Sequence, residues 1–155
     1  MSRIYYAMNI DTMNHMNDKT RGQYIIKIGE TGNIIRRARE LNRENDVLLK
    51  SWEVFDSVEY RRAVENIAHL LLVNNYYVER KGNDHYIVKN KAEVKRIEKD
   101  IDNIIKKAIA LTDAVDIVSI WRQGKGAAKK PLPHMKKNSI ILTDKKEVKK
   151  NEENY

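Results

Sequence analysis

The segment from Tyr24 to Arg39 constrains this chain most, because a strand, a tight turn and a basic helix follow one another in it without interruption. Residues 24–28 read Tyr-Ile-Ile-Lys-Ile, a β-branched run that is typical of a strand. Gly29 and Gly32 provide backbone freedom in the turn, and Asn33 is a residue type that caps helices. Three arginines then occupy the first turns of the helix: Arg36, Arg37 and Arg39. This combination predicts a place that holds a phosphate.

The net charge also favours an anionic partner. The 155 residues carry a formal net charge of +8, and nucleic acid is the commonest partner of such a basic chain. Residues 122–137 contain no acidic residue, and we expect them to contact a DNA backbone unless they form a solvated linker. The lysines predicted for this contact are Lys125, Lys129, Lys130, Lys136 and Lys137. DNA is the expected partner, and RNA remains open.

Several classes of protein are excluded by composition. The chain has no cysteine, so disulfides and thiolate metal sites are excluded. It has no run of about 18 apolar residues, so we expect no membrane span and no membrane partner. Residues 1–5 lack the apolar run of a signal peptide. We therefore expect an intracellular, cytoplasmic protein.

Apolar periodicity predicts an α/β domain, of the α+β kind, over residues 1–90. Strands are expected at 3–9, 24–28 and 47–55, and short ones at 76–79 and 85–88. Helices are expected at 34–42 and 58–74, the second capped by Asp56 or Ser57. Residues 11–22 are polar and turn-like, so the first two strands are expected to pair as an antiparallel hairpin with a long loop.

Residues 91–121 predict a helical extension beyond this domain. Apolar residues recur at helical spacing over 92–111, which indicates an amphipathic helix of about five turns. Its apolar face fits either packing within the chain or a homodimeric coiled-coil seam, because some spacings are seven residues. Residues 114–121 fit a strand or a continuing helix. Residues 122–155 are expected to form a basic loop and a charged, disordered tail.

The order of these motifs resembles the GIY-YIG endonuclease superfamily over about residues 3–90. Its phage and fungal DNA-binding branch is closest, because residues 27–31 read Lys-Ile-Gly-x-Thr and residues 63–69 read Ala-x-Glu-x-x-x-His. Residues 84–87, Asp-His-Tyr-Ile, match the short aromatic strand of that branch. The resemblance implies a three-stranded antiparallel sheet with flanking helices, and metal-dependent hydrolysis of DNA. It also favours a phage-encoded protein.

The resemblance implies roles for five residues. Arg37, eight positions after Gly29, would grip the scissile phosphate. Glu65 would hold a single Mg²⁺ or Mn²⁺ ion, which needs only one or two carboxylates. Tyr5 would act as general base or orient the water, with Tyr6 as the competing tyrosine, because neighbouring strand residues face opposite sides. The remaining roles fall to Lys27 and His69.

Lys27 and His69 each leave alternatives open. Lys27 interrupts an apolar strand, which suggests a position facing a cleft, where its ammonium would stabilise the pentavalent phosphorus or ionise Tyr5. A solvent-facing strand position is the simpler explanation. His69 shares a helix face with Glu65. It would be a second metal ligand, would orient Glu65 or a phosphate, or would pack in the core.

Three departures from the family pattern keep a second function open. Arg3 stands where the first motif has glycine, Lys27 where the second usually has tyrosine, and Leu41 where many members have histidine. The alternative is therefore a DNA-binding module or regulator of the same fold without catalysis. A third hypothesis is a structural or interaction protein that acts through an oligomerisation helix at 92–121.

Overall fold

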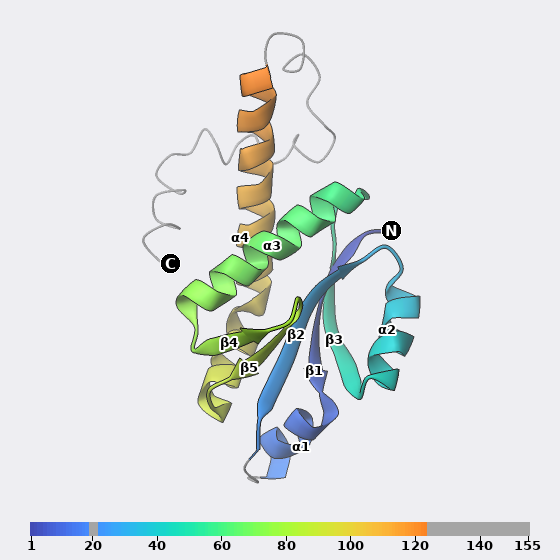
Figure 1. The fold of residues 1–155 in the computed structure, drawn as a ribbon, viewed down its shortest axis with the longest axis vertical. Helices are drawn as coiled ribbons and strands as arrows, with labels where there is room; N and C mark the ends of the chain where they lie inside the picture. The colour runs from blue at the N-terminus through green and yellow to red at the C-terminus, as the bar shows by residue number, and fades with distance from the viewer. Residues whose placement is uncertain (19–21, 124–155) are drawn as a thin grey trace.

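Over the residues that the structure describes, the chain forms a five-stranded antiparallel sheet and four helices (Figure 1). The computed structural model describes residues 1–18 and 22–123. The strands lie in the order β3-β1-β2-β5-β4. Their bounds are β1 Arg3–Asn9, β2 Tyr24–Thr31, β3 Asp46–Glu53, β4 Val78–Lys81 and β5 His85–Val88. The helices are α1 Ile10–Asp18, α2 Ile34–Arg43, α3 Val58–Asn75 and α4 Lys91–Gln123.

The predicted sheet of three strands is wrong, because the short hairpin of β4 and β5 joins it. The first half of β2, residues 24–27, pairs with β5, and β5 pairs with β4. The antiparallel pairing of β1 with β2 is confirmed. Buried and partly buried residues alternate along β5, and the two buried ones belong to the main core. A hairpin of two short strands is marginally stable alone, so β4 and β5 gain their stability as part of the sheet.

The segment predicted to be turn-like also differs, since α1 occupies most of it. Met13 and Met16 pack against the core. Thr12 Oγ1 accepts a hydrogen bond from Ile25 N at 2.8 Å and donates to Gln23 O at 3.2 Å, which ties α1 to the start of β2. The polar residues between the methionines concealed this amphipathic pattern in the sequence.

Capping residues fix where α2 and α3 begin. The Asn33 side chain accepts a hydrogen bond from Arg36 N, and the Ser57 side chain accepts one from Tyr60 N. Both satisfy a backbone donor that the first turn of a helix leaves free. The expected starts of both helices are confirmed, with Ser57 as the cap of α3.

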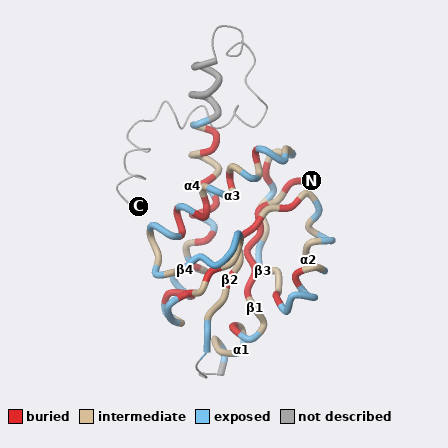
Figure 2. Tube along the Cα trace, viewed as in Figure 1, coloured by how far each residue is buried: buried red, intermediate tan, exposed pale blue. Residues whose placement is uncertain are grey.

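The sheet separates two apolar clusters, one on each face. Alternate residues of β1, Ile4, Tyr6 and Met8, join the main core with α3 and α4. Tyr5 and Ala7 point the other way and pack with residues of α2. Figure 2 shows β1 and the centre of β2 as the most continuously buried strands. Two adjacent tyrosines are therefore assigned to opposite faces.

The helix α4 is longer than expected and belongs to the main core. It continues through residues 114–121, which settles the choice between strand and helix for that stretch. Six of its apolar residues are buried in the main core, which favours packing within the chain, and a homodimeric seam stays a prediction; they are Val94, Ile97, Ile101, Ile104, Ile105 and Ala108. No helix in the described ranges combines the length and apolarity that a membrane span requires.

Candidate active site

Tyr5, Gly29 and Arg37 meet at one point of the sheet. Tyr5 and Gly29 are cross-strand partners in β1 and β2. A Cβ atom at position 29 would overlap the Tyr5 hydroxyl and ring, so glycine allows the phenol to lie across β2. The Tyr5 hydroxyl accepts a hydrogen bond from Arg37 Nε at 3.0 Å, and the guanidinium carbon lies 5.5 Å from the ring centroid. The structure thus brings the two strand motifs and the first turns of α2 together.

The choice between the two tyrosines follows from this geometry. Tyr6 lies on the opposite face, in the main core, and its hydroxyl has no hydrogen-bond partner among the described residues. Burial raises the pKa of Tyr5 above its ordinary value, and the hydrogen bond and charge of Arg37 only partly oppose that rise. Tyr5 is therefore the tyrosine beside Arg37, and its surroundings keep its hydroxyl protonated.

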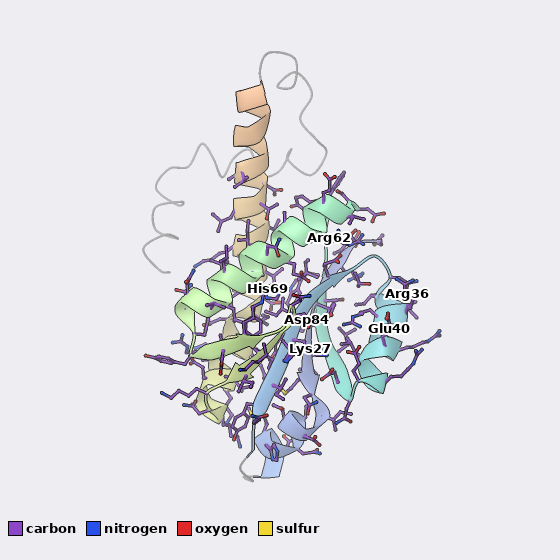
Figure 3. The ribbon with its side chains drawn as sticks, viewed as in Figure 1. Lys27, Arg36, Glu40, Arg62, His69 and Asp84 are labelled. Carbon is purple, nitrogen blue, oxygen red and sulfur yellow. The ribbon has the colours of Figure 1, made fainter. Side chains whose placement is uncertain are left out.

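The arginines of α2 divide into one inner and two outer residues. The Arg37 side chain is 19% exposed and lies near three carboxylates, those of Glu40, Glu44 and Asp84, at 3.6–3.9 Å. The side chain of Arg36 is 71% exposed and pairs with Glu40 at 3.8 Å, pointing away from the sheet (Figure 3). Arg39 is also exposed. Counting eight residues from Gly29 therefore selects the arginine that faces the tyrosine.

Glu65 lies where the edge of β2 is no longer covered by β5. Ile28 N still donates to Asp84 O at 2.9 Å, just before β5. Beyond it, Glu30 of β2 lies close enough to the Glu65 carboxylate on α3 for its backbone and its charge to act on the pKa of Glu65. The Glu65 side chain is 19% exposed. This position at the open strand edge brings Glu65 from α3 toward the residues around Gly29.

The carboxylates of Glu30 and Asp84, each ion-paired with arginine, act on the Glu65 carboxylate. Burial, then the charges of Glu30 and Asp84, raise the pKa of Glu65 to about 7, against the opposing effects of the Glu30 backbone hydrogen bond and of Arg80. Neighbouring carboxylates repel one another when all are ionised, so a proton on one of them or a bound cation stabilises the group. The folded protein therefore favours the protonated form of Glu65 more than an unfolded chain does.

His69 is buried next to Glu65, at 1% exposure. Its Nδ1 atom is hydrogen-bonded to the Tyr86 hydroxyl, and its Nε2 atom lies 3.9 Å from Glu65 Oε1. Burial, followed by the charge of Arg80, lowers the pKa of His69 to about 4. The imidazole is therefore neutral near pH 7, and 3.9 Å is too long for a hydrogen bond.

Lys27 occupies the Tyr5 side of the sheet but is engaged by two carboxylates. Its ammonium lies 2.7 Å from Asp46 Oδ2 and 3.0 Å from Glu44 Oε2. Desolvation would lower the pKa of Lys27, yet these carboxylates raise it overall. Glu44 also lies 3.6 Å from Arg37. Lys27 is thus linked to the site through Glu44, and its predicted role on phosphorus stays a prediction.

Sequence reasoning missed Asp84 and Tyr86 as site residues. Asp84, in the turn before β5, reaches Arg37 Nη2 at 3.6 Å and lies between β2 and α3 (Figure 3). Tyr86 holds His69. Both belong to the Asp-His-Tyr-Ile stretch that matched the family motif, so the signal was present. The position of the hairpin beside β2 was what the sequence did not reveal.

The chemistry of the donors fits a hydrated Mg²⁺ or Mn²⁺ ion. In the described part of the chain, no three His, Cys, Asp or Glu side chains form a group that could hold a metal ion alone. Magnesium usually keeps several waters and takes one or two carboxylates. Glu65, with its raised pKa and neighbouring Asp84, provides such a carboxylate. A zinc site, which takes three or four protein ligands, does not fit.

The predicted basic segment cannot be placed against this site. Its lysines, Lys125, Lys129, Lys130, Lys136 and Lys137, lie outside the described residues. The charged tail at 145–155 lies outside them as well.

Comparison with known protein families gives one match. A family model described as T5orf172 domain matches residues 3–109, from the start of β1 into α4. It therefore includes every residue of the site described above. No curated protein and no solved structure gives a significant match.

Proposed function

Because this chain belongs to the T5orf172 domain family, we propose that it is a divalent-metal-dependent endonuclease that hydrolyses DNA phosphodiester bonds. That family is associated with DNA-interacting proteins, which supports DNA as the partner. The observation that carries the proposal is the contact of Tyr5 with Gly29 and Arg37, together with a Glu65 charge close enough to raise the pKa of Tyr5. The order of the motifs supports the finer assignment to the phage and fungal branch of the GIY-YIG superfamily, and with it a phage origin.

The residues of the site divide the work of phosphodiester hydrolysis. Arg37 presents a planar donor fork that suits a phosphate, and its contacts to carboxylates at 3.6–3.9 Å are loose enough to exchange for one. The Tyr5 hydroxyl, held by Arg37, orients the attacking water. Glu65 would hold the Mg²⁺ or Mn²⁺ ion. Such an ion supplies a Lewis acid that neutralises phosphate charge and makes bound water more acidic.

The exposed arginines of α2 extend the site into a surface for the DNA backbone. Arg36 and Arg39 lie next to Arg37 in sequence but face solvent. Their contacts would position the duplex without reading its sequence. We include the lysines at 125–137 in the same electrostatic role, which should make binding depend strongly on salt.

Two observations favour a second candidate, a DNA-binding module of the same fold without catalysis. Burial keeps the Tyr5 hydroxyl protonated, so Tyr5 is a poor general base as it stands. Lys27 is neutralised by Asp46 and Glu44. A site that binds phosphate through Arg37 would remain even if the water were never activated.

Nicking of supercoiled plasmid separates the two candidates. The protein is incubated with plasmid in Mg²⁺ or Mn²⁺ and in EDTA, beside Glu65→Gln. Glu59→Gln is the matched control, because Glu59 lies on the same helix and is exposed. An endonuclease nicks in metal only, and Glu65→Gln alone abolishes nicking. Salt-sensitive binding without any nicking would favour the non-catalytic module.

A further inference from the structure

His69 carries a buried nitrogen that the fold leaves without a partner. The side chain is 1% exposed, yet its Nε2 atom makes no hydrogen bond in the described structure. The nearest charged group is the Glu65 carboxylate, 3.9 Å away and one turn earlier on α3. A buried polar atom without a hydrogen bond destabilises the fold. The unpaired Nε2 atom lies beside the candidate metal ligand, which indicates a role for His69 in the site.

The hydrogen bond from Tyr86 determines which nitrogen of His69 carries the proton. A tyrosine hydroxyl has one proton, and a neutral imidazole has one donor and one acceptor nitrogen. If Tyr86 donates to Nδ1, then Nε2 carries the imidazole proton and directs it toward the Glu65 carboxylate. In the opposite arrangement Nδ1 donates to Tyr86, and the Nε2 lone pair faces a carboxylate oxygen. With Glu65 ionised, that arrangement is repulsive at one end, and the described residues provide no acceptor for the Tyr86 proton.

We propose that Tyr86 and His69 form a positioning pair for Glu65, with the Tyr86 hydroxyl donating to Nδ1 and the protonated Nε2 facing the carboxylate. His69 is then a donor to the metal-binding glutamate and not a second metal ligand, because coordination through Nε2 requires its lone pair. The importance of this pair for catalysis rests on the proposed function, whereas the tautomer of His69 does not depend on that function.

The pair fits the architecture of the site. Tyr86 lies on β5, which is hydrogen-bonded to β2, while His69 and Glu65 lie on α3. Closing the gap from 3.9 Å to a hydrogen bond needs a shift of about 1 Å, within the reach of a partly exposed glutamate. The sheet thereby fixes the orientation of a carboxylate that the helix supplies. Such outer contacts to a metal ligand typically contribute 10–100-fold to metal affinity or activity.

The tautomer is tested directly by long-range ¹H–¹⁵N correlation NMR of the metal-free protein at about pH 8, where Glu65 is ionised. The His69 signals are assigned as those missing from His69→Gln. We expect the pattern of a neutral ring protonated at Nε2, and a mixture of tautomers in Tyr86→Phe. Protonation at Nδ1 in the wild-type protein would overturn the proposal. So would direct coordination of added Mg²⁺ or Mn²⁺ by Nε2. This measurement holds whether or not the protein cleaves DNA.

Substitutions test the positioning role. The amide of glutamine can place a donor where Nε2 lies, whereas leucine fills the space without one. We expect His69→Gln to nick plasmid within about fivefold of the wild type and His69→Leu to lose at least about tenfold, with melting curves showing that both are folded. Equal losses in the two folded variants, together with lost metal affinity, would identify His69 as a ligand and refute the pair. A wild-type protein that never nicks would refute the proposed function instead.

Discussion

The phenol ring of Tyr5 lies directly across Gly29 of the neighbouring strand, and a Cβ atom at position 29 would overlap it. This contact lets the Tyr5 hydroxyl reach Arg37 Nε at 3.0 Å. The two strand motifs are therefore one physical unit, in which glycine makes room for the tyrosine and the tyrosine receives the arginine.

Substitution of Gly29 by alanine tests this contact. The ring of Tyr5 is buried and rigid, so the added methyl must displace it or the strand, and overpacking of this kind typically costs about 1–3 kcal/mol. We expect a matching loss in the free energy of unfolding, measured with urea. Gly32→Ala is the control, because its nearest neighbour is the far end of the Arg61 side chain at 3.2 Å and not a ring. Equal stability of Gly29→Ala and the wild type would contradict the packing described.

The two tyrosines offer a paired test of the hydroxyl. Tyr5→Phe keeps the ring over Gly29 but removes the acceptor for Arg37, so we expect nicking to fall by about 100-fold or more while the melting temperature changes little. Tyr6→Phe removes a buried hydroxyl that has no partner among the described residues, so activity and fold should persist. Loss of nicking in Tyr6→Phe alone would reverse the assignment.

Substitution of two neighbouring arginines distinguishes the effect of a side chain's position from the effect of its charge. Arg37→Ala and Arg36→Ala each remove one positive charge from α2, but only Arg37 contacts Tyr5. We expect Arg37→Ala to abolish measurable nicking and Arg36→Ala to weaken DNA binding by less than about tenfold, as one backbone contact does. Nicking rates and binding are measured at the same salt concentration. Similar nicking by the two variants would argue against a phosphate grip by Arg37.

Glu65 should make the metal-free protein less stable as pH rises. Its pKa is raised from 4.5 to about 7, so the folded state binds more protons than the unfolded state between these values. Stability therefore falls across that window and is constant above it. In EDTA at about pH 8, Glu65→Gln should exceed the wild type by about 2–3 kcal/mol, and the difference should vanish below pH 4.5. Urea unfolding at several pH values measures it, and a pH-independent difference would disagree.

A bound metal ion should offset the loss of stability that ionised Glu65 causes in the wild type. An ion that binds only the folded state raises the melting temperature with concentration. We expect Mg²⁺ or Mn²⁺ to stabilise the wild type near pH 8 and to leave Glu65→Gln unchanged. Differential scanning fluorimetry measures both. An equal shift in the two proteins would place the ion elsewhere.

We predict that Lys27 stabilises the fold, whatever part it takes in the reaction. Its ammonium lies 2.7 Å from Asp46, whose side chain is 3% exposed. Removing one partner of a buried pair costs about 3–5 kcal/mol, so Lys27→Met should cost about 3 kcal/mol. Adding Asp46→Asn should recover part of this loss, because it removes the unpaired charge. Strictly additive effects in the double mutant would show that the pair is not coupled.

Much of the fold was predictable because its signals are local. Strand alternation, helical spacing and caps such as Asn33 and Ser57 act within a few residues. The contribution of α4 to the core was open, since an apolar face does not reveal what covers it. The helix α1 was missed because methionines among polar residues give a weak pattern.

The site residues that belong to a local sequence motif were predictable. The residues that strand pairing brings to the site were not. Counting from Gly29 reached Arg37, and the structure brings it to Tyr5. Asp84 and the Tyr86 contact to His69 depend on the register of β5 against β2, which is a long-range property. The partners of Lys27 come from β3 and the end of α2, so no local signal announced them.

We propose that the residues around Gly29 break a phosphodiester bond. The most direct measurement is the nicking rate of supercoiled plasmid in Mn²⁺ for the wild type and Glu65→Gln, with binding to the same DNA measured in parallel. We expect equal binding, nicking by the wild type that EDTA stops, and no nicking by Glu65→Gln. Nicking that persists in Glu65→Gln or in EDTA would contradict it, as would a wild type that binds and never nicks.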